Sequence, residues 1–176
     1  GQWDYLFVDE ASQVSLADTV ATARCASNIV LLGDQMQLPQ PVEGWHPGDS
    51  GKSVLEYIMG THLTVPPEAG IFLGITYRMH PDICAPISVG VYEGRLTAVS
   101  GAERQALVLN PGADAALKGA GVLYVPVRHE GDRRASDAEC KRIQELYQSL
   151  LGQSWRDRNG TKHPMTAGDI LVVAPY

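Results

Sequence analysis

Two adjacent carboxylates, Asp9 and Glu10, follow directly after the apolar run 5–8. At the end of a buried strand, a first acid can hold Mg²⁺, directly or through water, and a second acid can orient a water molecule that attacks a phosphate. Four apolar residues followed by two acids are the Walker B pattern of proteins that hydrolyse nucleotides. The same pattern also fits a strand that merely ends in a charged turn.

A polar loop follows the second apolar run, 28–32, and begins with Gly33 and Asp34. Parallel strands end at one edge of their sheet, so we expect this loop and the Asp9–Glu10 pair to face one crevice. A glutamine in such a loop, which contains Gln35 and Gln37, can contact a γ-phosphate and respond to its loss. The alternative is an ordinary polar connection between a strand and a helix.

The third chemical feature is the segment 77–81, Tyr-Arg-Met-His-Pro, which follows the apolar run 71–76. Arg78 is suited to be an arginine finger, which stabilises the charge on a γ-phosphate in the transition state. The alternative is an arginine held in a structural ion pair at a helix start. We expect His80 to cap or buttress the Arg78 loop rather than to act as a base.

These residues need a scaffold in which strands and helices alternate, and the apolar spacing predicts one. Helices are expected at 14–24, 53–60, 81–92 and 136–151. Buried strands are expected at 5–8, 28–32, 71–76, 122–127 and 170–174, with loops at 39–52, 94–121 and 155–168. A strand, a helix and a strand within thirty residues indicate a doubly wound α/β sheet.

Composition restricts the partners and the compartment. The 176 residues carry a net charge of −6, so the chain is a poor nucleic-acid binder by charge alone. Three scattered cysteines indicate reduced, mostly buried thiols of a cytoplasmic protein. No apolar run is long enough for a membrane span, and no secretory signal opens the chain, so no membrane partner is expected. The abrupt start without methionine indicates a piece of a longer chain.

The segment 48–53 has some features of a phosphate loop, but we predict that it is not one. The pattern requires a glycine five positions before Gly51, and His46 occupies that position. No strand is expected before the segment, because residues 38–45 are interrupted by prolines. A true phosphate loop is therefore expected upstream of Gly1.

Taken together, the three features resemble motifs II, III and IV of superfamily 1B helicases, the nonsense-decay- and Dna-two-like group. The motifs are Asp-Glu-Ala-Ser-Gln at 9–13, Gly-Asp-Gln-Met-Gln-Leu-Pro at 33–39 and Tyr-Arg-Met-His-Pro at 77–81. They occur in the family's order, and the resemblance covers nearly the whole chain. Segments 46–48, 53–56 and 155–160 are further similar to a bacterial subgroup in which a RecB-like nuclease domain precedes the helicase.

The resemblance implies ATP and Mg²⁺ as cofactors. It makes Asp9 the Mg²⁺ partner, Glu10 the acid that activates water, and Gln37 the γ-phosphate sensor. Gly33 and Asp34 would belong to the same nucleotide-binding loop.

On the other side of the nucleotide, the resemblance makes Arg78 the arginine finger. Tyr77 would stack on the adenine, although an aromatic residue packed in the core is an equal alternative for it.

The implied fold is α/β, with RecA-like parallel-sheet lobes of a P-loop NTPase. Residues 1–76 would end the first lobe and 77–176 would begin the second. The implied function is a helicase or translocase that uses ATP hydrolysis to move on or unwind single-stranded or duplex DNA or RNA, with the fragment itself inactive. The alternative is a degenerate ATPase lobe that is a scaffold for an associated RecB-like nuclease.

Five basic side chains are candidates for contacts with a nucleic-acid backbone, although an ordinary solvated surface is favoured for them. They are Arg128, Arg133, Arg134, Lys141 and Arg142.

Overall fold

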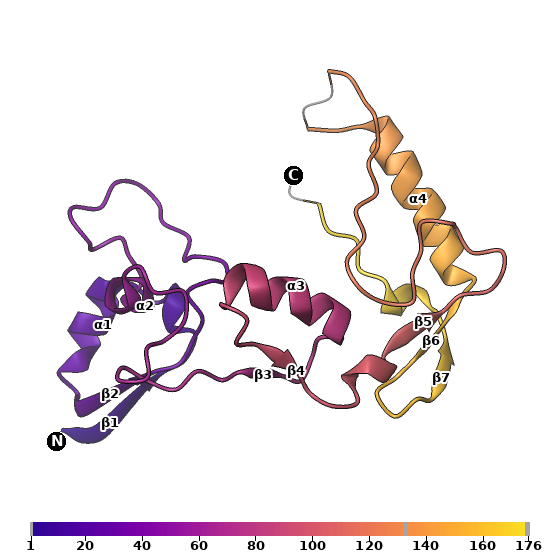
Figure 1. Cartoon of the computed structure of the whole chain (residues 1–176). Coiled ribbons are helices and arrows are strands. Elements are labelled where there is room, and N and C mark those ends of the chain that lie inside the picture. Colours follow the sequence, from indigo (N-terminus) through magenta and orange to yellow (C-terminus); the bar gives the residue numbers. More distant parts are fainter. Residues whose placement is uncertain (1, 132–133, 175–176) are drawn as a thin grey trace. The chain divides into compact units, whose positions relative to one another are not determined.

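The computed structural model describes residues 2–131 and 134–174 and divides into two compact units (Figure 1). The first unit contains the residues up to Phe72 together with 91–93. The second unit contains 73–90 and the chain from Gly94 onwards. The assignment of 1–76 and 77–176 to two RecA-like lobes stays a prediction.

The first unit begins with a strand, a helix and a parallel strand, as the sequence predicts. Strand β1 (Trp3–Val8) pairs in parallel with β2 (Ala26–Leu31), and Val8 lies opposite Leu31 at the carboxyl end. The short 3₁₀ helix η1 (Ala11–Gln13) and helix α1 (Leu16–Ala23) connect the two strands. Helix α2 (Val54–Met59) follows the long loop after β2.

Serine caps determine where both helices of this unit begin. The Ser15 hydroxyl accepts a hydrogen bond from the Asp18 amide at 3.0 Å, and the Ser53 hydroxyl accepts one from the Glu56 amide at 3.1 Å. Each bond satisfies an amide that has no partner within its own helix. The capped helices pack on one face of the strand pair, in a core made of Ala11, Val54 and Leu55 with Val8, Leu16 and Leu31.

The prediction that β1 is buried is wrong for one of its two faces. Trp3, Tyr5 and Phe7 alternate along the strand and are 73%, 60% and 65% exposed. A parallel strand is buried on both faces only where layers cover both sides of its sheet. In the part of the first unit that the structure describes, the helices cover only the face that carries Val8.

The second unit contains two small sheets. Its elements are β3 (Ile75–Thr76), α3 (Pro81–Val91, whose last residue belongs to the first unit), β4 (Thr97–Ala98), η2 (Ala102–Arg104), β5 (Ala106–Val108), α4 (Asp137–Leu151), β6 (Ser154–Arg156), β7 (Lys162–Pro164) and η3 (Ala167–Asp169). Strands β3 and β4 pair in parallel, whereas β5, β6 and β7 form an antiparallel sheet in that order. The Ser136 hydroxyl caps α4, as predicted, by accepting from the Glu139 amide.

Several predicted strands and loops of this unit are wrong. Only Ile75 and Thr76 of the run 71–76 are in a strand, while 122–127 and 170–174 form none. Both runs lie within the described ranges but find no ladder partner there, and an apolar run becomes a strand only when its backbone groups are paired. Conversely, the expected loops 94–121 and 155–168 contain β4, β5, β7 and most of β6, because strands of two or three residues are too short to show a recognisable apolar pattern.

The fold is therefore mixed α/β with small parallel sheets. The three cysteines are free thiols, but only Cys84 is buried, so the prediction of mostly buried thiols is wrong for Cys25 and Cys140. None of the helices within 2–131 and 134–174 is long and apolar enough to cross a membrane.

Candidate functional site

The carboxyl ends of β1 and β2 meet at one edge of the sheet and present the two acids there. The Leu32 amide donates to the Val8 carbonyl at 2.8 Å, and the Ala11 amide returns to the Leu32 carbonyl at 2.8 Å. Asp9 and Glu10 lie between these two bonds, so the backbone turns outward at both acids. We call this feature, Asp9–Glu10 together with the loop 33–37, the acidic edge.

Glu10 adopts an unusual backbone conformation that completes this turn. Its φ is 51° and its ψ is 42°, in the left-handed region that non-glycine residues seldom occupy. Strained residues of this kind persist where surrounding contacts impose them, and they cluster at functional sites. Here the two bonds to Leu32 impose the conformation.

The Asp9 carboxylate keeps one oxygen available for a metal ion. Its Oδ1 accepts from the Glu10 amide at 3.0 Å, and its Oδ2 has no hydrogen bond with any residue in the described ranges. Both acids are exposed. No group of three or more metal-ligating side chains occurs in the described part of the chain. One free carboxylate suits Mg²⁺, which usually takes one or two protein carboxylates and completes its shell with phosphate and water.

Gly33 is required by close packing at the acidic edge. A Cβ atom on this residue would lie 2.9 Å from the Ala11 nitrogen and 2.8 Å from Leu55 Cδ1. The first of these contacts is with backbone, which cannot move aside without breaking the bond between Ala11 and Leu32. Gly33 therefore lets the second loop pass directly beside the first.

Asp34 and Gln37 lie together in this second loop. Asp34 Oδ1 accepts from the Met36 amide at 3.0 Å, and Asp34 Oδ2 accepts from Gln37 Nε2 at 3.0 Å. The same Oδ2 accepts from the Tyr92 hydroxyl at 2.5 Å. Asp34 thus uses both oxygens inside the protein, which makes it an organiser of the loop.

A hollow of about 370 Å³ lies beside Gln37 and is lined by the loop after β2, by Ser12 of η1, and by α2 with the segment that follows it. Ser12 contributes to its wall and is almost fully buried, and its hydroxyl has no hydrogen-bond partner among the described residues. Gln35 is held in place by bonds from its Nε2 to the His62 and Leu63 carbonyls. Gln37 thus lines the hollow, whereas Asp9 and Glu10 do not.

The Arg78 segment belongs to the second unit. The Arg78 guanidinium is exposed and forms no ion pair or hydrogen bond with any residue that the structure describes, so the alternative of a structural ion pair finds no support there. Tyr77 is 64% exposed, which does not fit an aromatic residue of the core. The Tyr77 carbonyl accepts a hydrogen bond from Arg158 in the β6–β7 turn.

His80 caps helix α3, as expected. Its Nδ1 accepts from the Asp82 amide at 3.0 Å, so the proton of the neutral ring lies on Nε2, which is 3.2 Å from the Glu103 carbonyl. Both ring nitrogens are thereby used, and His80 is not free to act as a base.

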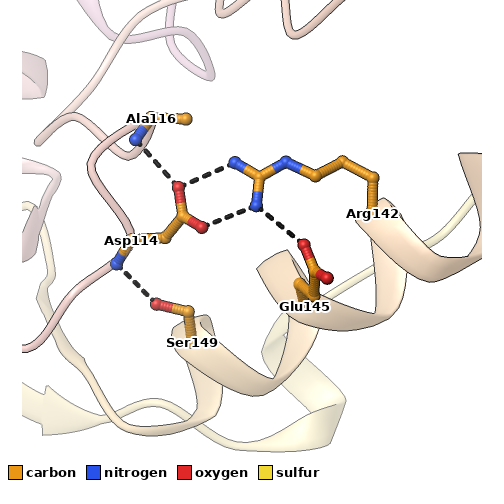
Figure 2. Close-up of polar contacts among 5 residues, drawn as sticks. All are labelled: Asp114, Ala116, Arg142, Glu145 and Ser149. Carbon is orange, nitrogen blue, oxygen red and sulfur yellow. Dashed lines mark hydrogen bonds and ion pairs between the residues drawn. The ribbon is translucent and has the colours of Figure 1, made fainter. Parts of the chain in front are cut away.

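The basic candidates differ in availability. Arg142 forms a bidentate ion pair with Asp114, at 2.6 and 2.8 Å, so its guanidinium is used within the chain (Figure 2). Arg128, Arg134 and Lys141 are exposed. Arg133 lies outside the described residues.

Sequence reasoning missed three residues of these sites. Tyr92 bonds to Asp34 from 58 positions away, and Arg158 bonds to the Tyr77 carbonyl from 81 positions away. No spacing rule connects these two pairs, so only the folded chain identifies them. Ser12 lies within the motif 9–13, but only the structure shows that it lines the hollow.

Comparison with known proteins gives four related sequences of one kind. The chain is 35% identical over 95 residues to the DNA replication ATP-dependent helicase/nuclease DNA2 of Gallus gallus. It is 34% identical over 110 residues to DNA2 of Xenopus laevis and 32% identical over 114 residues to dna2 of Schizosaccharomyces pombe. The chain resembles a helicase segment.

These alignments cover 54%, 62% and 64% of this chain, but only 9%, 10% and 8% of the relatives. The chain thus spans about a tenth of the length of the helicase/nucleases that it matches. No family model matches it.

Proposed function

We propose that this chain is part of a superfamily 1B helicase that uses ATP hydrolysis to move on or unwind DNA. The observation that carries the proposal is the acidic edge, where Asp9–Glu10 and the Gln37 loop are joined through Leu32. The similarity to DNA2 proteins, whose name describes ATP-dependent helicase/nucleases acting in DNA replication, supports the same activity.

The residues of the acidic edge would divide the chemistry among them. Mg²⁺ bound with ATP would neutralise part of the negative charge of the phosphates. Asp9 would hold the ion through its free Oδ2, Glu10 would accept a proton from the attacking water, and Gln37 would contact the γ-phosphate. Arg78 would stabilise the charge that develops on the transferred phosphoryl group, and the exposed Tyr77 ring would stack on adenine.

The larger organisation follows from the same proposal. Residues 1–76 would close a first RecA-like lobe and 77–176 would open a second. The phosphate loop would lie upstream of Gly1, and a RecB-like nuclease domain would belong to the same polypeptide. We place this protein in the cytoplasm. We propose that it moves on DNA rather than on RNA.

The test is Glu10→Gln in the longer protein, with ATP hydrolysis measured on DNA that has a single-stranded tail. We expect ATP binding to persist and hydrolysis to fall by about 10³-fold or more, because only the group that accepts the proton is lost. Glu43→Gln, an exposed glutamate of the loop after β2, is the matched control and should leave the rate unchanged.

Unchanged hydrolysis in Glu10→Gln would remove this residue from catalysis. Nuclease activity in a wild-type protein that hydrolyses no ATP would instead favour a degenerate lobe that is a scaffold.

A further inference from the structure

One carboxylate oxygen connects the predicted γ-phosphate sensor to a distant tyrosine. Asp34 Oδ2 accepts from Gln37 Nε2 at 3.0 Å and from the Tyr92 hydroxyl at 2.5 Å. The other oxygen of Asp34 is held by the Met36 amide. The sensor side chain is therefore attached to a carboxylate whose position is fixed from two directions.

Tyr92 is well placed to fix that carboxylate. It lies in the segment 91–93, which returns to the first unit directly after helix α3. Its ring is partly buried and lies 6.2 Å from the Phe72 ring, centre to centre. Burial and the bond to Asp34 raise the pKa of Tyr92 to about 12, so the phenol stays a neutral donor near neutral pH.

Gln37 needs such an anchor. Its side chain is exposed, and the terminal torsion of a glutamine has only a broad preference, so solvent alone would leave the carboxamide in many orientations. The bond to Asp34 leaves the Gln37 Oε1 and one amide hydrogen available for a ligand. A displacement of Asp34 would move both groups.

We propose that Tyr92 is a positioning residue for the predicted γ-phosphate sensor, acting through Asp34 on the Gln37 carboxamide. The proposal rests on the proposed function for its catalytic consequence, but the positioning itself is a property of this chain. Two experiments separate these two parts.

The first experiment measures the Gln37 side chain in this 176-residue chain by nuclear magnetic resonance. Tyr92→Phe removes only the hydroxyl and keeps the ring beside Phe72. We expect the Gln37 side-chain amide signals to shift and to gain mobility. The Gln35 amide, which is held by His62 and Leu63, should stay unchanged, and Tyr57→Phe on α2 is the matched control.

The second experiment is a double-mutant cycle on ATP hydrolysis in the longer protein. We expect Tyr92→Phe to lower kcat about tenfold with little change in KM, because a small misplacement of a transition-state contact affects the chemical step. In a Gln37→Ala background, the same change should alter kcat by less than about twofold, because coupled residues are non-additive.

The outcomes are distinct. An undisturbed Gln37 amide in Tyr92→Phe overturns the positioning role whatever the enzyme does. Full additivity in the cycle overturns the catalytic consequence and leaves the proposed function intact. A longer protein without any ATP hydrolysis contradicts the proposed function, while the resonance experiment still decides the positioning.

Discussion

The acidic edge of the first unit and helix α4 of the second unit use charged side chains in opposite ways. At the acidic edge, the Glu10 carboxylate and Asp9 Oδ2 have no hydrogen bond with any described residue. Along α4, the Arg142 guanidinium binds both oxygens of Asp114 and also reaches Glu145 at 3.2 Å (Figure 2). The open charges of Asp9 and Glu10 fit the proposed ligand site, whereas the paired charges of Arg142 and Asp114 have a structural role.

The α4 contacts attach a long loop to the helix. The Asp114 amide donates to the Ser149 hydroxyl at 2.8 Å, and the Asn110 amide donates to Gln153 Oε1 at 2.7 Å. Together with the Arg142–Asp114 pair they form what we call the α4 anchor. It stabilises a segment that has no regular structure between 109 and 136 in the described ranges.

The largest effect should come from Arg78, whose guanidinium has no partner among the residues that the structure describes. Arg78→Ala in the longer protein should lower ATP hydrolysis by about 10³-fold, on the scale of other arginine fingers, without loss of helix content in circular dichroism. Arg78→Lys should recover only part of the rate, because lysine lacks the planar fork. Normal turnover combined with a collapsed second unit would show that Arg78 is structural.

A moderate effect on stability should come from the α4 anchor, and it should depend on pH. The Arg142 guanidinium lowers the pKa of Asp114 to about 2, below the ordinary value of about 3.9 in an unfolded chain. The stabilisation is therefore complete above about pH 4 and is lost as pH falls towards 2. Asp114→Asn should lower the thermal midpoint by a few degrees at pH 7.

The control for this prediction is the same comparison at low pH. Near pH 2 the difference in thermal midpoint between the wild-type chain and Asp114→Asn should be much smaller than at pH 7, because the carboxylate is then about half protonated in the folded chain and almost fully protonated in the unfolded one. A difference that persists unchanged from pH 7 to pH 2 would mean that the shape of Asp114, rather than its charge, stabilises the loop.

A smaller and local effect should appear in the titration of tyrosine. Because the pKa of Tyr92 rises to about 12 in the fold, from about 10, its phenol should ionise only at strongly alkaline pH. Its bond contributes stability below pH 10 that is lost as pH rises to 12. Tyr92→Phe should remove the last step of the absorbance titration. An unchanged last step would contradict the bond to Asp34.

The sequence predicts the acidic edge better than the α4 anchor for a physical reason. Asp9 and Glu10 follow one apolar run directly, Gln37 lies five residues after the end of the next, and parallel pairing of those runs brings their ends together. Asp114 and Arg142 are 28 positions apart on a loop and a helix, and no periodicity relates them. Similarly, the apolar runs 122–127 and 170–174 carry a strand signal without the ladder partners that a strand requires.

The smallest effect should come from the segment that most resembles a phosphate loop in sequence. The Lys52 ammonium is 2.7 Å from Asp49 Oδ1, and this contact raises the pKa of Lys52, so the cation is already paired. The Ser53 hydroxyl is committed to the Glu56 amide, and no strand lies between Leu32 and Ser53. A working phosphate loop instead follows a strand and turns its lysine and backbone amides towards the phosphates.

Lys52→Ala should therefore leave Mg-ATP binding by this chain unchanged and weak in isothermal titration. Micromolar binding that disappears with Lys52→Ala would make the segment 48–53 the phosphate site, and the acidic edge would then lose its place as the centre of the chemistry.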